Sequence, residues 1–301
     1  MCAANAQPLI DPYHSRDVPR EEQAPRVDPV VYGKPGDGPL SADQLADFER
    51  DGFLFLPSLF SADEVLELQK HAAGLAKKVD PDQDWVIAEP DSRTVRSVFK
   101  VHRLDEVFVE LAREPRLAGV ARQILGSDVS VHQSRINFKP GFRGKEFYWH
   151  SDFETWHVED GMPRPRAVSA SIILTPNNEF NGPLMLVPGS HKVYVRCVGE
   201  TPEDNYKSSL KKQEIGTPSV DALTAMVRDG GIVAPKGEAG SVIFFDCNTM
   251  HGSAGNISPF PRNNVFFVYN SLENALTEPF GADKPRPDFL GDRDAPPVGR
   301  L

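Results

Sequence analysis

The sequence predicts a mainly β protein with added helices, of the sandwich or jelly-roll class. From residue 129 onward the chain is a series of short runs rich in β-branched and aromatic residues. Pro, Gly and Asn separate these runs, and the helical patterns with clear start signals lie mostly before residue 129. Several short strands joined by such turns are typical of sandwiches and jelly rolls.

The predicted strands of this region share a length of a few residues and a high content of Val, Ile, Phe and Tyr. They cover residues 129–138, 147–151, 168–174, 184–187, 241–245 and 264–269. Turn residues such as Asn177-Asn178 and Pro188-Gly189 lie between them.

Helices are predicted where a start signal precedes an apolar pattern. Residues 41–44 and 61–64 have the Ser-x-x-Gln and Ser-x-x-Glu forms of a capping box, and each begins a helix. A further strand is expected over residues 53–57, between these two helices. Additional helices are predicted over residues 116–125 and near residues 219–228.

The chain is expected to form one main domain with loosely ordered ends. Residues 1–39 are rich in Pro, Asp, Arg and Gly and are predicted to be a flexible arm. Residues 40–294 form the domain, and its polar stretch at about 192–231 is predicted to be a lid over a pocket. The segment after Glu278 is again rich in Pro and Asp, and residues 295–301 are interpreted as a tail.

Composition excludes several classes of partner and location. The 301 residues carry a net charge of −10 without a basic patch, which argues against nucleic acid and anionic membranes as partners. The three cysteines lie far apart, so neither a disulfide framework nor a Cys-rich zinc site is indicated. The beginning of the chain lacks the pattern of a signal peptide and no run is long enough to span a bilayer, so a cytoplasmic location is expected.

The most informative segment is residues 147–157, which contains His150 and Asp152. On a strand, residues two apart point to the same face, so both side chains could reach one metal ion. The best third ligand is His251, which follows the apolar run 241–245. Two His and one carboxylate on one face of an octahedron are the ligand set of non-haem Fe(II) oxygenases. The remaining positions accept a chelating 2-oxo acid and O₂.

Cationic and polar side chains near this segment fit an anionic cosubstrate. Arg262 lies eleven residues after His251, just before the predicted strand 264–269, and its guanidinium can hold the distal carboxylate of 2-oxoglutarate. A solvated loop arginine would have the same sequence context. The run 133–139 places polar residues on one face of a strand, as a solvent-facing strand also would. These residues are Gln133, Arg135, Asn137 and Lys139.

A family resemblance adds to these observations. The His-x-Asp motif, the distal His251, the trailing Arg262 and the run 181–191 (NGPLMLVPGSH) resemble the phytanoyl-CoA dioxygenase-like superfamily. Within it, the uninterrupted stretch FYWHSDFETWHVEDGMPRPR at residues 147–166 is similar to the signature of the ectoine hydroxylases. The resemblance covers roughly residues 40–294 and is densest over residues 133–192. Pro165 is a position where that family is expected to carry another residue.

The resemblance implies a double-stranded β-helix (jelly-roll, cupin-like) core, a homodimer, and hydroxylation of ectoine to 5-hydroxyectoine with release of succinate and CO₂, for osmotic-stress protection. The implied catalytic groups are the iron(II) ligands His150, Asp152 and His251. It implies 2-oxoglutarate contacts from Lys139, Arg262 and Ser253. It implies ectoine contacts from Gln133 and Trp156.

Ectoine carries an amidine and a carboxylate, so its site needs an aromatic face and hydrogen-bond donors. The aromatic candidates near the metal are Trp149, Phe153 and Trp156. The donor candidates are Gln133, Arg135 and Thr155. Trp156 would share the face of His150 and Asp152 on a regular strand, although a core tryptophan would fit the pattern too.

Other groups in the segment are not needed for the chemistry, because hydroxylation of this kind requires no side-chain acid or base. We assign them to hydrogen bonds around the metal ligands or to the surface. They are Glu154, His157, Glu159 and Asp160. Cys247 is interpreted as a small buried residue rather than a ligand.

Three alternative functions remain open at the level of the sequence. One is the same chemistry on another small amino-acid-like substrate such as proline. A second is a non-catalytic jelly-roll binding protein that retains a metal-like pocket. A third is a zinc hydrolase that uses the same ligands.

Overall fold

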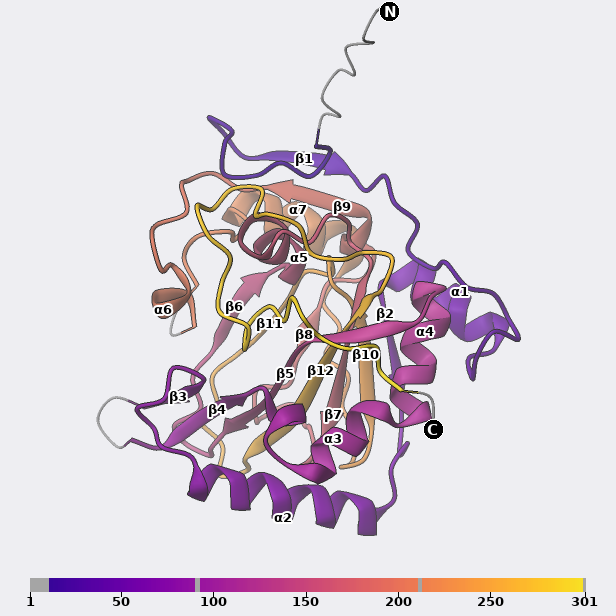
Figure 1. Cartoon of the computed structure of the whole chain (residues 1–301), viewed down its shortest axis with the longest axis vertical. Helices are drawn as coiled ribbons and strands as arrows, with labels where there is room; N and C mark the ends of the chain where they lie inside the picture. Colours follow the sequence, from indigo (N-terminus) through magenta and orange to yellow (C-terminus); the bar gives the residue numbers. More distant parts are fainter. Residues whose placement is uncertain (1–10, 90–92, 211–212, 300–301) are drawn as a thin grey trace, which may run out of the picture.

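A computed structural model describes residues 11–89, 93–210 and 213–299 of the chain (Figure 1). Its centre is a seven-stranded antiparallel sheet, with a three-stranded and a two-stranded antiparallel sheet beside it. The large sheet has the spatial order β2 (Phe53–Leu56), β10 (Val242–Asp246), β7 (Ala167–Ile173), β12 (Arg262–Ser271), β5 (Val129–Lys139), β4 (Val95–Phe99) and β3 (Val86–Ala88). The small sheets are β6 (Phe147–His150), β11 (His251–Ser253) and β8 (Met185–Leu186), and β1 (Glu22–Pro25) with β9 (Val193–Arg196).

The two faces of the large sheet are both buried, and alternation along each strand divides the core in two. In β10, Val242 and Phe244 belong to the cluster shared with the helices. Ile243 and Phe245 point the other way and pack with Leu186 of β8, which joins the large sheet to the three-stranded sheet. Two antiparallel sheets packed face to face in this way form a jelly-roll core, so the predicted fold class is confirmed.

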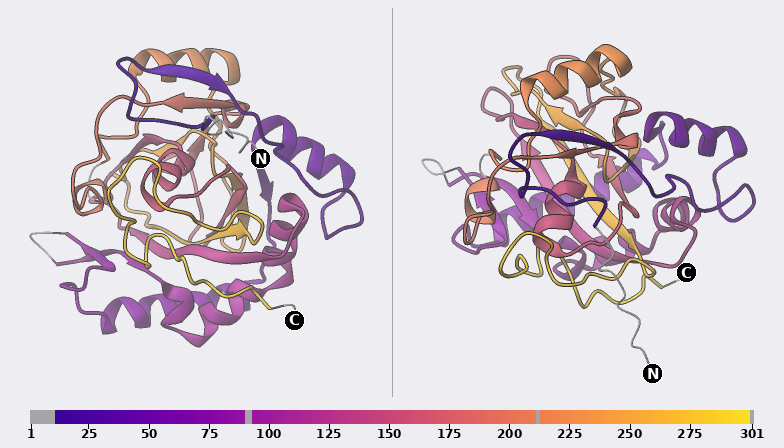
Figure 2. Two further views of the ribbon diagram at one scale, coloured as in Figure 1. Left: turned by 45° about the horizontal axis from the view of Figure 1, so that its top comes forward. Right: turned by 90° about the horizontal axis from the view of Figure 1, so that it is seen from above.

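Helices cover the outer face of the large sheet. The α-helices are α1 (Ala42–Asp51), α2 (Ala62–Lys78), α3 (Glu106–Arg113), α4 (Val120–Leu125), α5 (Asp152–Thr155), α6 (Tyr206–Ser209) and α7 (Val220–Gly230). Single helical turns are η1 (Val101–Arg103), η2 (Pro115–Gly119), η3 (Trp156–Asp160) and η4 (Ser190–Lys192). Figures 1 and 2 show α2 and α3 on one side of the large sheet, with α7 and the β1–β9 pair on the opposite side.

The predicted helix starts are confirmed at the level of individual hydrogen bonds. The side chains of Ser41 and Ser61 each accept a hydrogen bond from the backbone N–H of the third helical residue, Gln44 or Glu64. The side chains of Gln44 and Glu64 in turn accept from the backbone N–H of Ser41 and Ser61. Helix α4 ends at Gly126, whose φ of 62° is a left-handed conformation that glycine adopts without strain. These local signals are therefore sufficient to place the helices that cover the sheet.

The prediction of a flexible arm over residues 1–39 is wrong for residues 11–39. Strand β1 pairs with β9 in register from Glu22 opposite Arg196, and Tyr13 is only 1% exposed. A Pro-rich, charged segment can be ordered when its few apolar and charged groups find partners that lie far away in the sequence. Residues 1–10 lie outside the described residues.

The segment after Glu278 is also better ordered than predicted. Leu290 is fully buried, and Arg286 donates to Asp160 at 2.7 and 2.6 Å. Its order depends on distant polar partners, which a local pattern does not reveal. Within the described residues, no helix has the length and apolar character needed to cross a bilayer.

Candidate active site

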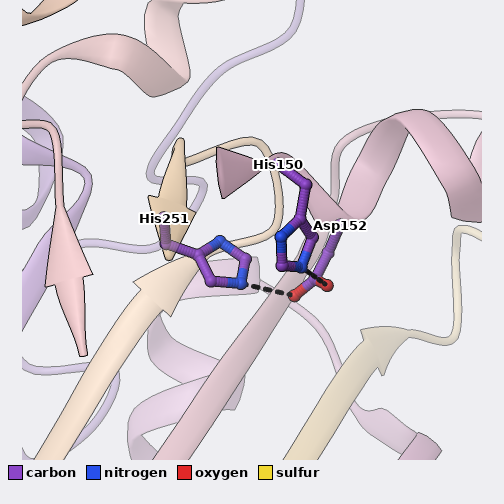
Figure 3. A group of neighbouring side chains, drawn as sticks. All are labelled: His150, Asp152 and His251. Atoms are coloured by element: carbon purple, nitrogen blue, oxygen red, sulfur yellow. Dashed lines mark ion pairs between the residues drawn. The ribbon is translucent and has the colours of Figure 1, made fainter. Parts of the chain in front are cut away.

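Three side chains converge on one point, two from the neighbouring strands β6 and β11 and one from the helical turn that follows β6 (Figure 3). His150 ends β6, and His251 begins β11 directly opposite it. His150 Nε2 lies 3.6 Å from Asp152 Oδ1, and His251 Nε2 lies 3.8 Å from Asp152 Oδ2. All three ligand atoms lie within 4.8 Å of one another, and no other such group exists among the residues that the structure describes.

The route by which Asp152 reaches this point differs from the prediction. The sequence was interpreted as one strand carrying both His150 and Asp152, but β6 stops at His150 and α5 begins at Asp152. The extended Ser151, with φ of −105° and ψ of 131°, connects the two. The convergence survives because a sharp strand-to-helix turn brings side chains two residues apart to the same side.

The donor groups fit a divalent metal ion. His150 Nδ1 and His251 Nδ1 lie 2.7 and 2.9 Å from the carbonyl oxygens of Tyr148 and Thr249, and each ring donates its Nδ1 proton to that oxygen. This leaves both Nε2 lone pairs facing Asp152, as metal-bound histidines require. Asp152 Oδ2 is buried and accepts no hydrogen bond from the described residues. A bound cation would satisfy this oxygen.

Electrostatics keep these groups in the ligating forms. Burial acts to raise the pKa of Asp152, but the neighbouring His251 and His150 outweigh it and hold that pKa well below its usual range. Burial, assisted by His150, lowers the pKa of His251 to about 4. At neutral pH the site therefore contains a carboxylate and a neutral imidazole, the protonation states in which these side chains bind metals.

A second cluster, beside the three converging side chains, brings together two buried basic residues. Lys139 of β5 and Arg262 of β12 lie opposite each other in the sheet and are 2% and 3% exposed. Lys139 Nζ donates to Ser253 Oγ at 2.8 Å, and Arg262 Nη2 donates to the same oxygen at 3.4 Å. Ser253 follows His251 by two residues on β11, so both side chains lie on the same face of that strand.

Among the residues that the structure describes, no carboxylate forms an ion pair with either basic side chain of this cluster. Burial lowers the pKa of Lys139 to about 6, with the nearby Arg262 as the second cause, and burial lowers the pKa of Arg262 to about 10. Arg262 Nε is buried without a hydrogen-bond partner among the described residues. Buried positive charge without a carboxylate is costly on its own and favours the binding of an anion.

A cavity of about 730 Å³ opens next to the metal ligands. This volume suits a small molecule together with a cosubstrate. The lining comes from strands β3 to β6, the α5–η3 turn, the polar stretch at about 192–231 (called the insertion below) and the segment after Glu278. It includes Gln133, Arg135, Asn137, His150, Asp152, Thr155, Trp156, Gln213, Glu214, Thr217, Arg286 and Leu290.

The predicted polar face of β5 thus faces the cavity with Gln133, Arg135 and Asn137, while Lys139 lies with Arg262 and Ser253. Gln133 donates to the carbonyl of Leu290 at 2.8 Å, and Arg135 donates to Gln133 Oε1. Burial lowers the pKa of Arg135, although Asp152 acts in the opposite direction. The strand therefore points its donors into the cavity rather than into solvent.

Of the aromatic candidates, only Trp156 lines the cavity. It does so from η3 rather than from a strand, so the predicted reason for its orientation is wrong. Phe153 packs in a core with Tyr13, and Trp149 packs against the cluster that contains Val187. Thr155 also lines the cavity and accepts a hydrogen bond from Gln213 at 3.3 Å.

Two groups of residues in this region were not predicted. Arg286 lines the cavity and is fixed by two hydrogen bonds to Asp160, but it lies in a Pro-rich segment without any local motif. Glu154 and Glu159 were assigned to hydrogen bonds or to the surface, and they are buried in ion pairs with Arg16. In the sequence, only the number of charged residues within 152–160 indicated that some of them are buried in ion pairs. Cys247 is fully buried, as predicted.

Comparison with known proteins places this geometry in a family. The phytanoyl-CoA dioxygenase family model matches residues 48–264. An ectoine dioxygenase of Sphingopyxis alaskensis is 55% identical over 297 residues, which cover 97% of this chain and 96% of that protein. The chain belongs to the ectoine dioxygenases of the phytanoyl-CoA dioxygenase family. The predicted family is therefore confirmed.

Solved structures of this family share the whole fold. A crystal structure of EctD from S. alaskensis with 2-oxoglutarate and 5-hydroxyectoine has a TM-score of 0.87 and 50% identity, covering 97% of this chain and 98% of that one. A structure of the same protein with bound Fe has a TM-score of 0.87 at 48% identity, with the same shares covered. The double-stranded β-helix fold is confirmed by this similarity.

Proposed function

We propose that this protein is an Fe(II)- and 2-oxoglutarate-dependent dioxygenase that hydroxylates ectoine to 5-hydroxyectoine, releasing succinate and CO₂. One observation carries the proposal. The three side chains His150, Asp152 and His251 converge beside a cavity of about 730 Å³. The buried basic cluster adjoins them through Ser253, which lies two residues after His251 on β11. The relatives named above supply the substrate class, because their names and bound ligands are ectoine and 5-hydroxyectoine.

His150, Asp152 and His251 would hold the iron(II), which supplies the activation of O₂ coupled to decarboxylation of 2-oxoglutarate. The chain's own residues would bind the cosubstrate at its far end. Lys139 and Arg262 would pair with the distal carboxylate, and Ser253 would donate to it. A carboxylate placed there pairs with the buried Arg262 guanidinium and favours the ammonium form of Lys139, so the pairing is stronger than at a solvated surface.

The substrate would occupy the wider part of the cavity. Trp156 offers a fixed aromatic face to the amidinium of ectoine, since its ring is held at 5.0 Å from that of His132. Gln133, Arg135 and Thr155 offer donors to the carboxylate, and Arg286 adds a charged one. The amidinium and carboxylate are thus recognised by different walls, which fixes the orientation of the ring between them.

The insertion would keep water away from the reacting atoms. Residues 209, 210, 213, 214 and 217 line the cavity from this segment, which the sequence predicted as a lid. Excluding water favours turnover of 2-oxoglutarate only with substrate in place. The insertion is therefore proposed to couple cosubstrate consumption to hydroxylation.

Parallel incubations with ectoine and with proline, each with 2-oxoglutarate, Fe(II) and air, test the proposal. Succinate release and a gain of one oxygen by mass analysis are expected with ectoine and much less with proline. Equal turnover of proline would identify a different substrate. Absence of succinate with either compound would favour a binding protein, and activity restored by Zn(II) but not Fe(II) would favour a hydrolase.

Three further properties remain predictions. A homodimer, a cytoplasmic location and a role in protection from osmotic stress follow from the family resemblance and from the sequence. Sedimentation velocity of the purified protein measures the first directly. A monomer across the working concentration range would contradict the dimer without affecting the proposed chemistry.

A further inference from the structure

The turn that carries Asp152 and Trp156 rests on a buried ion pair supplied from far away in the sequence. Arg16 Nε and Nη2 donate to the two carboxylate oxygens of Glu154 at 3.0 and 2.8 Å, and Arg16 Nη1 donates to Glu159 at 2.7 Å. The three side chains are only 2–3% exposed. Glu154 lies two residues after Asp152, and Glu159 lies three after Trp156.

The backbone around Arg16 is held firmly in an unfavourable conformation. Its φ of 66° is in the left-handed region, which is uncommon for a residue with a long side chain. Arg16 N donates to the carbonyl of Cys197 at 2.9 Å, and Ser15 Oγ donates to Glu154 Oε1 at 2.8 Å. Such a conformation persists only where the surroundings over-determine it, and it commonly marks a functional constraint.

The same ion pair supports the insertion. Arg16 Nη1 also donates to Thr201 Oγ1 at 3.1 Å, and Asn205 donates to Glu159 at 2.8 Å. Gly216 packs so closely that a Cβ there would lie 2.2 Å from Glu154 Oε2 and 2.6 Å from Arg16 Nη2. Its neighbours Gln213 and Thr217 line the cavity. The guanidinium of Arg16 therefore contacts both the turn that carries Asp152 and Trp156 and the insertion.

We propose that Arg16 is a positioning residue, which sets Asp152 and Trp156 on one wall of the cavity and residues 213–217 on another. The proposal rests on the hydroxylase function proposed above. Two buried carboxylates require the cation, and the planar guanidinium joins them in a fixed geometry that a lysine does not reproduce. Loss of that geometry displaces the substrate relative to the metal ligands while the cosubstrate site on β5 and β12 stays intact.

Two variants probe this arrangement from opposite sides. Arg16→Lys keeps the charge but removes the simultaneous contacts with Glu154, Glu159 and Thr201. Gly216→Ala keeps all three side chains of the ion pair but adds a Cβ that cannot fit beside Glu154 and Arg16 unless the insertion or the pair shifts. Arg50→Lys is the matched control for the first, since Arg50 pairs with Asp47 and Asp51 at an exposed position.

The second variant also has a matched control. Gly189→Ala places a Cβ on a residue whose φ of 79° is similar to the 72° of Gly216, at a position where this Cβ would have no atom within 4 Å. It therefore reproduces the backbone strain of Gly216→Ala without the contact with Glu154. Circular dichroism and the melting temperature first establish that each protein is folded.

The metal-free proteins give the first readout. Amide hydrogen exchange over residues 150–160 and 213–217 should rise at least about tenfold in Arg16→Lys and Gly216→Ala and change little in the controls. The Fe(II)-loaded enzyme gives the second readout. Hydroxylated product per succinate should fall at least about threefold and the KM for ectoine should rise about tenfold, with the KM for 2-oxoglutarate changed less than about twofold.

A purely structural role would reduce the active fraction and kcat alone, with product per succinate and both KM values unchanged. That result in either folded variant would overturn the proposal, as would a Gly216→Ala enzyme indistinguishable from Gly189→Ala. Wild-type enzyme measured in the same experiment distinguishes failure of the proposed function from failure of the positioning role. If it releases no hydroxylated ectoine, the proposed function fails; if it does while Arg16→Lys remains fully coupled, only the positioning role fails.

Discussion

The two ends of the cavity are built in different ways. At the end proposed for the metal and the cosubstrate, five of the six side chains lie on paired strands: His150 on β6, His251 and Ser253 on β11, Lys139 on β5 and Arg262 on β12. At the end proposed for the substrate, Gln133 and Arg135 lie on β5, but Arg286, Gln213 and Trp156 come from an irregular segment, the insertion and a helical turn. Strand pairing fixes nearly all of the first end, whereas long-range ion pairs and hydrogen bonds fix much of the second.

This contrast indicates a different role for each end of the cavity. A sheet register positions ligands to within the tolerance of backbone hydrogen bonds, which suits chemistry that is shared by many substrates. Irregular segments can be altered without disturbing the sheet, which suits recognition of one substrate. We expect variants at the two ends to have separable effects on cosubstrate and on substrate.

The largest effect is expected from His251→Ala, which removes one of three metal ligands. Activity should fall by about 10³-fold or more, because the site loses a neutral nitrogen donor that nothing nearby replaces. Fe(II) affinity, measured by anaerobic equilibrium dialysis, should fall in parallel. His71→Ala, a histidine paired with Asp105 away from the cavity, is the control. Undiminished turnover in His251→Ala would remove this residue from the metal site.

A large effect confined to the cosubstrate is expected from Arg262→Met. Loss of a buried charge-assisted pair with the distal carboxylate should raise the KM for 2-oxoglutarate about 100-fold. The KM for ectoine should change less than about twofold, since Arg262 lies outside the substrate part of the cavity. Steady-state kinetics with each compound varied in turn provides both values. A parallel rise in both constants would show that the two ends are not independent.

The converse pattern is expected from Arg286→Met. Loss of its charge from the cavity should raise the KM for ectoine about 30-fold and leave the KM for 2-oxoglutarate within about twofold. The change leaves Asp160 buried without its main partner, so the double variant Asp160→Asn/Arg286→Met serves as a second protein. An unchanged KM for ectoine in both proteins would remove Arg286 from the substrate site.

The smallest effect expected is a proton linked to cosubstrate binding. Burial lowers the pKa of Lys139 from its ordinary 10.5 to about 6, so Lys139 is neutral in the free protein at pH 8. A bound carboxylate favours the ammonium form and raises that pKa. At a pH between the pKa of Lys139 in the free protein and its raised pKa in the complex, binding of 2-oxoglutarate therefore takes up a proton. In that range the affinity for 2-oxoglutarate falls as the pH rises.

Calorimetry at pH 8 in buffers of different ionisation enthalpy measures this uptake. About one proton should be taken up by the wild-type protein beyond the value for Lys139→Met. Proton release, or the same uptake in both proteins, would show that Lys139 does not receive the carboxylate.

How much could be predicted from the sequence follows the same division. The strands that carry His150 and Lys139 have apolar runs or alternation that a local pattern reveals. His251 and Arg262 are predicted only beside the strands 241–245 and 264–269, and they lie on β11 and β12 themselves. The turn at Ser151 was missed because a strand and a strand-to-helix junction both place residues two apart on one side. Local propensity cannot distinguish them within so few residues.

The substrate end was predicted only in part, for a physical reason. Residues 11–39 and the segment after Glu278 have little apolar periodicity, and they are ordered by contacts such as Arg16 with Glu154 and Arg286 with Asp160. The partners of these contacts are more than a hundred residues apart in the chain, so no local window contains the signal. The number of charged residues in 152–160 was the only available indication.

The most direct test of the proposed function is the fate of labelled oxygen. The protein is incubated with ectoine, 2-oxoglutarate, Fe(II) and ¹⁸O₂, and the products are analysed by mass spectrometry. One ¹⁸O atom in 5-hydroxyectoine and one in succinate are expected from a dioxygenase. Label absent from both compounds, or hydroxyl oxygen derived entirely from water with unlabelled succinate, would contradict the account.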